Sequence, residues 1–217
     1  MLDAEFVFDL DDTLYREKSY VVSAFNFVAQ VVETLYHVND CKARLLNSFA
    51  AGDADPIETL WRREGLPLSG KKDVVAAMRA HMPSITLDQG AAELLRILRV
   101  EGRGFSIVTD GRSVTQRAKL AALGCLDAKV ISISEEVGLA KVSLDRFRPI
   151  ERLFPSNRYF YIGDNPAKDF IAPNKLGWTT IMLADDGTNI HPKINPSEDG
   201  MEAHYTVQSL TEVRDLL

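Results

Sequence analysis

The sequence predicts an α/β protein: a doubly wound, Rossmann-like parallel sheet with a small all-helical domain inserted after the first strand. Three observations predict this fold. Short apolar runs of strand length recur along the chain, helical patterns separate the later runs, and a long helical stretch separates the first run from the second. The runs lack the alternation of half-exposed strands, which is typical of parallel strands that are covered on both faces.

Five apolar segments form the predicted sheet, and a sixth strand is expected near the C-terminal end. They lie at residues 6–8, 105–108, 130–133, 159–162 and 179–182, with a surface loop at 185–200 before a last strand around 204–207. Parallel neighbours need crossover connections, and a right-handed connection through a helix is the common solution. The sheet should therefore be buried between two layers of helices.

Helices are predicted between the later strands because apolar residues recur there at helical spacing. The segments lie at residues 91–98, 114–123, 144–154 and 170–176. Gly124 and Gly177 are placed to end the second and the fourth of them. The third strand is followed by a solvated loop that contains Glu135 and Glu136 and reaches Lys141.

The first two strands are separated by about ninety residues, far more than one crossover helix requires. Helical patterns fill the interval at 21–35, 45–49, 57–61 and 71–82. Asp55 and Pro56 suit the N-cap and the first turn of the third of these helices. We therefore predict two domains, a Rossmann-like core formed by residues 1–15 and 83–217 and a helical domain at residues 16–82.

Composition and charge exclude several classes of protein. The chain has 31 acidic and 25 basic residues, a formal net charge of -6, which argues against a general nucleic-acid binder. Its apolar runs are too short to cross a bilayer, and its first residues do not resemble a secretory signal. Cys41 and Cys125 are too few for a disulfide framework, so we expect reduced thiols in a cytoplasmic protein. A small-molecule partner is expected, with no nucleic acid and no membrane.

Acidic and polar residues follow the predicted strands, where open α/β sheets bind their ligands. The residues that should converge at this edge are Asp9 and Asp11 after the first strand, Thr109, Asp110 and Gly111 at the end of the second, Lys141 after the third, and Asp164 and Asp169 after the fourth. Buried unpaired carboxylates are costly, and a hard divalent cation would relieve their repulsion. Magnesium is the usual choice beside a phosphate, and Lys141 and Thr109 suit phosphoryl oxygens. The set predicts phosphoryl transfer through an acyl-phosphate.

On these residues the chain resembles the haloacid dehalogenase superfamily, in particular its phosphatases whose helical cap lies between the first and second motifs. Asp9-Leu10-Asp11-Asp12-Thr13 matches the first motif, DxDxT, and Thr109 matches the second. Lys141 matches the third, although Val142 stands where a proline is usual. Gly163-Asp164 and Asp169 match the fourth, GDxxxxD. The order of the motifs and the helical insertion agree over essentially the whole chain.

The resemblance implies a role for each motif residue. Asp9 would be the nucleophile, and Asp11 would protonate the leaving oxygen and later deprotonate the attacking water. The Asp9 carboxylate, the Asp11 backbone carbonyl and Asp164 would hold Mg²⁺. Thr109 and Lys141, with backbone N–H groups near Asp11 and Asp110, would bind the phosphoryl oxygens, and the substrate-binding residues would be Thr109, Asp110, Gly111 and Lys141. Behind this set, Asp169 would orient Lys141 or a metal-bound water, and Thr13 would support the first motif.

The function predicted is that of a magnesium-dependent phosphatase for a small phosphorylated metabolite, either a sugar phosphate or a nucleoside monophosphate. An acid at position 11 favours phosphoester cleavage over dehalogenation, since a departing halide needs no proton. A phosphomutase shares every core motif and stays an alternative, as does a catalytically silent binding protein with this fold. A signalling receiver is disfavoured, because its phosphorylated aspartate ends the third strand of a shorter domain without an insertion. The sequence predicts no oligomeric state.

Overall fold

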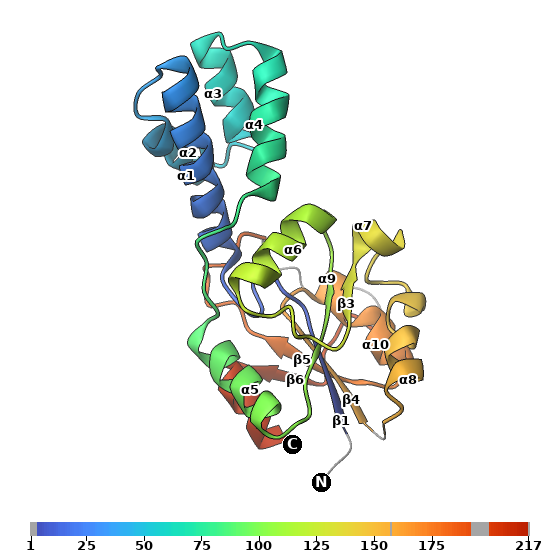
Figure 1. Ribbon diagram of the computed structural model, residues 1–217. Coiled ribbons are helices and arrows are strands. Elements are labelled where there is room, and N and C mark those ends of the chain that lie inside the picture. The colour runs from blue at the N-terminus through green and yellow to red at the C-terminus, as the bar shows by residue number, and fades with distance from the viewer. Residues whose placement is uncertain (1–3, 157, 192–199, 217) are drawn as a thin grey trace. The chain divides into compact units, whose positions relative to one another are not determined.

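The computed structural model describes residues 4–156, 158–191 and 200–216, and it divides into two compact units. One unit comprises the chain up to Lys18 together with the chain from Thr86 onward, and the other is Ser19–Ile85. Figure 1 shows the sheet in the first unit and a group of helices in the second.

The first unit is built on a six-stranded sheet in the order β3-β2-β1-β4-β5-β6. Every neighbouring pair is parallel, which confirms the predicted fold class. The strands are β1 (Ala4–Phe8), β2 (Ser106–Thr109), β3 (Ile131–Ile133), β4 (Arg158–Gly163), β5 (Thr179–Leu183) and β6 (Tyr205–Val207). With β1 in the middle, between β2 and β4, the residues that follow these three strands lie side by side at one edge.

Helices connect the strands and cover both faces of the sheet. They are α5 (Gln89–Val100), α6 (Ser113–Ala122), α7 (Ser134–Val137), α8 (Arg148–Leu153), α9 (Pro166–Asp169) and α10 (Ile171–Lys175), with 3-10 helices η1 (Leu144–Arg146) and η2 (Leu210–Leu216). Figure 1 shows α5 on one side of the sheet and α8 with α10 on the other. On the α8 side, Val7 and Tyr161 from the strands pack with Phe147, Ile150 and other buried side chains.

One predicted helix is divided, and a proline gives the reason. The segment 144–154 is split between η1 and α8, whereas the segment 170–176 forms α10 as predicted, with the separate short helix α9 before it. Pro149 has no N–H to donate to the carbonyl of Asp145, so a continuous α-helix cannot run from residue 144 through this position. The loop predicted after β3 is also partly wrong, because Glu135 and its neighbours form α7.

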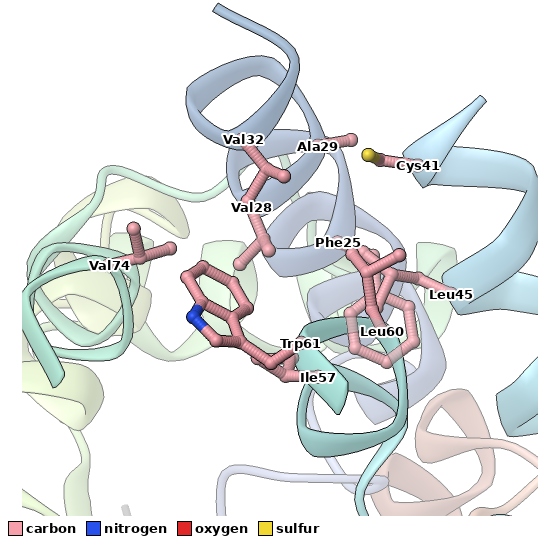
Figure 2. Close-up of a cluster of buried hydrophobic side chains, with 10 residues drawn as sticks. All are labelled: Phe25, Val28, Ala29, Val32, Cys41, Leu45, Ile57, Leu60, Trp61 and Val74. Carbon is pink, nitrogen blue, oxygen red and sulfur yellow. The ribbon is translucent and has the colours of Figure 1, made fainter. Parts of the chain in front are cut away.

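The second unit is helical wherever secondary structure is described. Its helices are α1 (Glu17–Tyr36), which starts in the first unit, α2 (Cys41–Ala50), α3 (Pro56–Glu64) and α4 (Leu68–Ala80). Asp55 caps α3 as expected, since its carboxylate accepts the N–H of Glu58. Figure 2 shows apolar side chains from all four helices converging on one core around Trp61, whose indole N–H donates to the carbonyl of Pro67.

The structure also bears on two expectations from composition. Cys41 and Cys125 are both buried and free of disulfides. Among the residues that the structure describes, no helix has both the length and the apolar character that a transmembrane segment requires.

Candidate active site

A cavity of about 110 Å³ lies in the first unit where the strands end. Asp9 follows β1, Thr109 ends β2 and Asp164 follows β4, while Lys141 reaches the cavity from the turn after α7. Its lining residues are Asp9, Asp11, Asp12, Glu17, Thr109, Asp110, Lys141, Asp164, Asn165, Lys168 and His191. Most of the residues singled out from the sequence therefore surround one small space.

Lys141 joins two carboxylates beside this cavity. Its Nζ lies 2.5 Å from Oδ1 of Asp9 and 2.8 Å from Oδ1 of Asp169. Asp169 is fully buried and also accepts hydrogen bonds from the hydroxyl of Tyr161 and the backbone N–H of Asn165. Burial alone would lower the pKa of Lys141, but attraction to Asp169 and Asp9 raises it well above its ordinary value. Lys141 is thus a fixed positive charge next to Asp9.

Asp9, Asp164 and Asp169 form a cluster in which one oxygen from each carboxylate lies within 4.8 Å of the others. Burial raises the pKa of Asp9 to about 7; Lys141 opposes this shift, and repulsion from Asp169 adds to it. Burial, with repulsion from Asp9 and Asp169, raises the pKa of Asp164 to about 8. The positive charge near these carboxylates is too small for all of them to be ionised at the same time. An all-oxygen donor set of this kind fits a hard divalent cation.

The three carboxylates of this cluster are not equally available to such a cation. Both oxygens of Asp169 already accept hydrogen bonds from protein groups. Asp164 accepts a hydrogen bond of 3.0 Å from the Asn189 amide on Oδ2. Asp9 and Asp164 are therefore the better candidates for direct ligands, and Asp11 could add only its backbone carbonyl, since its side chain is engaged elsewhere.

The side chain of Asp11 is held by three donors. Its Oδ1 accepts from Nζ of Lys119 at 2.7 Å and from the hydroxyl of Tyr15, and its Oδ2 accepts from Nε2 of Gln116 at 2.8 Å. Burial would raise the pKa of Asp11, but attraction to Lys119 and these hydrogen bonds lower it. Asp11 is thus held as a carboxylate at the wall of the cavity. Lys119 and Gln116 did not stand out in the sequence.

The residues at the end of β2 are fixed by side chains from other elements. Thr109 Oγ1 accepts from Nε2 of Gln116 at 2.9 Å, and the Asp110 carboxylate pairs with Arg146 at 3.1 Å. The backbone N–H of Gly111, expected to face an anion, donates instead to Oγ of Ser134 at 2.9 Å. Gly111 does not line the cavity among the described residues, whereas Thr109 and Asp110 do.

The remaining residues of the first motif lie in the turn after Asp11. Asp12 has a left-handed backbone, and its carboxylate accepts the N–H groups of Glu17 and Ile190. Burial raises the pKa of Asp12. Thr13 is buried, and its hydroxyl has no hydrogen-bond partner among the described residues. Both residues belong to the turn, but only Asp12 lines the cavity.

Two charged residues that the sequence patterns did not single out also line the cavity. Glu17, the first residue of α1, lies 3.6 Å from Nε2 of His191, and burial with repulsion from Asp11 raises the pKa of Glu17 to about 7. Lys168 lies on α9 and is exposed. The one sequence feature that could have pointed to Lys168 is its position between Asp164 and Asp169, the two acids of the fourth motif.

The cavity, its carboxylates and the parallel sheet agree with what comparisons with known proteins show. The model of the haloacid dehalogenase-like hydrolases matches residues 6–177, so the chain belongs to that family. The resemblance drawn from the four motifs is confirmed.

Individual relatives match most of the chain. A glyceraldehyde 3-phosphate phosphatase of Methanocaldococcus jannaschii is 25% identical over 224 residues, covering 97% of this chain and 95% of its own. A ribulose-1,5-bisphosphate 5-phosphatase of Halopiger xanaduensis is 25% identical over 64% of this chain and 59% of its own. The HAD-hydrolase YfnB of Bacillus subtilis, solved bound to magnesium, has a TM-score of 0.67 at 21% identity and covers 100% of this chain and 99% of its own.

Proposed function

We propose that this chain is a magnesium-dependent phosphatase that hydrolyses a small phosphorylated metabolite through an aspartyl-phosphate at Asp9. One observation carries the proposal: Lys141 lies between Asp9 and Asp169, and Asp11 and Thr109 line the same cavity. The two phosphatase relatives act on phosphorylated sugars according to their names, which favours a sugar phosphate over a nucleoside monophosphate.

The proposed reaction has two displacements at phosphorus. First, Asp11 takes up a proton as the phosphate dianion binds, because the added negative charge favours its neutral form. An oxygen of Asp9 then bonds to phosphorus while the bond to the leaving oxygen breaks, and that oxygen keeps the electron pair and takes the proton from Asp11. Water then attacks phosphorus as Asp11 takes a proton from it. The bond to Asp9 breaks and the electron pair returns to the Asp9 carboxylate. The products are an alcohol and inorganic phosphate, and the enzyme is restored.

Charge neutralisation is the other task of the site. Lys141 supplies a fixed ammonium, and the hydroxyl of Thr109 can donate to a phosphoryl oxygen. The Asp9 and Asp164 carboxylates, with the Asp11 backbone carbonyl, would hold Mg²⁺. When bound, the ion would offset the repulsion between Asp9 and the phosphate dianion. The raised pKa values of Asp9 and Asp164 support this assignment, because without a bound cation too little positive charge surrounds the two carboxylates.

The cavity also constrains the substrate. At about 110 Å³ it is far smaller than the roughly 300–1,000 Å³ of sites that enclose a whole drug-sized ligand. We therefore place the phosphoryl group in it and the rest of the substrate outside. Glu17 and Lys168 line the cavity and are suited to meet polar groups of the leaving alcohol. The helical unit, expected at residues 16–82, is proposed to be the cap that screens substrates.

Hydrolysis of p-nitrophenyl phosphate tests the proposal. Activity should require Mg²⁺, disappear with a chelator and return when Mg²⁺ is restored. Asp9→Asn should abolish the activity, while thermal unfolding should still show the transition of a folded protein. Retained activity in Asp9→Asn would refute the nucleophile, and release of a phosphate isomer instead of inorganic phosphate from a hexose phosphate would point to a mutase. A panel of phosphorylated sugars and nucleoside monophosphates then ranks substrates by kcat/KM.

A further inference from the structure

Helix α6 turns two polar side chains inward toward the site. Gln116 and Lys119 are three residues apart on this helix, so they share one face, and only 2% and 3% of their surfaces are exposed. Lysine is almost never so buried unless it is paired. Their burial therefore indicates that each has a defined task within the first unit.

Lys119 engages the carboxylate of Asp11 from the side of α6. Its Nζ is 2.7 Å from Oδ1 of Asp11 and lies 5.9 Å from the ring centroid of Tyr15. The hydroxyl of Tyr15 donates to the same oxygen of Asp11. An ammonium and a phenol that converge on one carboxylate oxygen fix its orientation more firmly than either could alone.

Gln116 connects Asp11 to the end of β2. Its Nε2 is 2.8 Å from Oδ2 of Asp11, 2.9 Å from Oγ1 of Thr109 and 2.7 Å from the carbonyl oxygen of Asp110. The amide is committed as a donor, since its own oxygen is buried and has no partner among the described residues. With a lone pair of Thr109 facing this amide, the hydroxyl proton of Thr109 is directed to another acceptor.

We propose that Lys119 and Gln116 are positioning residues of the phosphatase reaction: Lys119 fixes the Asp11 carboxyl for proton transfer, and Gln116 couples it to the hydroxyl of Thr109. The inference rests on the proposed function. Neither residue touches the reacting atoms. They act through Asp11, which exchanges a proton with the leaving oxygen and then with water, and through Thr109, which donates to the phosphoryl group.

A series of leaving groups tests the role of Lys119. An alkoxide needs a proton to depart, whereas p-nitrophenolate departs well without one, so misplacing Asp11 penalises alkyl phosphates most. We expect Lys119→Met to lower kcat/KM for glycerol phosphate about 100-fold and for p-nitrophenyl phosphate less than about 5-fold, within the 10²–10⁴-fold range of acid–base catalysis. Lys119→Arg should recover part of the loss on glycerol phosphate.

Matched controls separate positioning from general damage. Arg117→Met removes an exposed cation from the same helix, where it pairs with Glu136, and should change kcat/KM less than about twofold on both substrates. In an Asp11→Asn background, Lys119→Met should have no further effect on the ratio of the two kcat/KM values. An equal loss on both substrates, or a further change of the ratio in Asp11→Asn, would overturn the role of Lys119.

Gln116 is tested by phosphate binding. Gln116→Leu should weaken competitive inhibition by inorganic phosphate about tenfold, as Thr109→Val does, and the double variant should be no worse than Thr109→Val alone. Additive losses would overturn the coupling. If the wild type is inactive, or if Asp9→Asn stays active, the proposed function itself fails. If the wild type is active and Asp9→Asn is inactive, but the expected effects of the Lys119 and Gln116 variants are not found, only this inference fails.

Discussion

A methyl group at Gly163 would place its carbon 2.5 Å from Oδ2 and 2.7 Å from Cγ of Asp169. Gly163 ends β4, and Asp169 is fully buried with both oxygens engaged. The carboxylate that holds Lys141 therefore depends on the absence of a side chain six residues earlier. The glycine of the fourth motif is required for space here and not for an unusual backbone conformation.

Gly163→Ala should displace Asp169 and thereby Lys141. We expect a loss of about 1–3 kcal/mol in the free energy of unfolding, typical of overpacking a buried site. Misplacement of Lys141 should lower kcat/KM roughly 10- to 100-fold. Denaturant unfolding and steady-state kinetics measure the two effects. If the change acts through Asp169, the double variant with Asp169→Asn will lose no more activity than Asp169→Asn alone, and multiplying losses would contradict this.

Lys141→Met should destabilise the protein as well as inactivate it. The lysine is buried between Asp9 and Asp169, and removing one partner of a buried ion pair costs about 3–5 kcal/mol because it leaves an uncompensated charge. Adding Asp169→Asn to this variant removes one of the stranded carboxylates. Urea unfolding should then show part of the stability regained, while hydrolysis stays absent. Unchanged stability in Lys141→Met would contradict the buried pairing.

Stability of the metal-free protein should fall as pH rises. Burial raises the pKa of Asp9 from 3.8 to about 7 and that of Asp164 from 3.8 to about 8. In both cases the folded state holds its proton more tightly than the unfolded chain does. The stabilisation this gives is fully present below pH 4 and is lost as pH rises through 7 to 8. Other titratable groups also make the free energy of unfolding depend on pH, so the pH dependence of the wild type is compared with that of Asp164→Asn.

Added Mg²⁺ should reverse this trend, because the ion binds the ionised carboxylates. The rise in melting temperature that saturating Mg²⁺ produces should be larger at pH 8 than at pH 5.5. Asp164→Asn should abolish most of that rise and flatten the metal-free dependence on pH. Scanning calorimetry across this range, with and without Mg²⁺, measures both. A rise that is equal at the two pH values would argue against direct binding to these groups.

The sheet could be predicted because its strands contain short apolar runs without the alternation of half-exposed strands. The runs that contain Phe6, Ile107 and Ile162 have the composition that burial on both faces requires. Helix periodicity was less informative about continuity, because it records which face is apolar and not whether each N–H has an acceptor. Pro149 therefore divides the segment 144–154, although its apolar spacing is regular.

Asp9, Thr109 and Asp164 could be predicted as cavity residues from their positions at strand ends alone. This prediction required no information about side-chain contacts. The supporting residues could not be predicted in this way. On α6, Gln116 and Lys119 are of types usually found on the solvent face, and their buried positions depend on where the helix packs. Arg146 was equally hidden within an amphipathic segment. Polar residues buried by tertiary packing leave no periodic signal in a single sequence.

Arg146 provides a final prediction. It is buried, and its guanidinium donates to Oγ and the carbonyl oxygen of Ser132 at 3.0 and 2.9 Å, to the carbonyl of Thr109 at 3.0 Å and to Asp110. A lysine keeps the charge but cannot reproduce this planar set of donors. Arg146→Lys should lower the free energy of unfolding by about 2–4 kcal/mol, since each hydrogen bond to a charged group contributes ~1.5–3 kcal/mol.

The matched control lies two residues further along. Arg148 pairs with Asp145 at 3.2 Å on the surface, with 46% and 65% of the two side chains exposed. Arg148→Lys should therefore stay within about 0.5 kcal/mol of wild type. Because Arg146 holds the carbonyl of Thr109, its loss should also raise the inhibition constant of inorganic phosphate several-fold, which Arg148→Lys should not do. Equal effects of the two substitutions would mean that Arg146 does not anchor the end of β2.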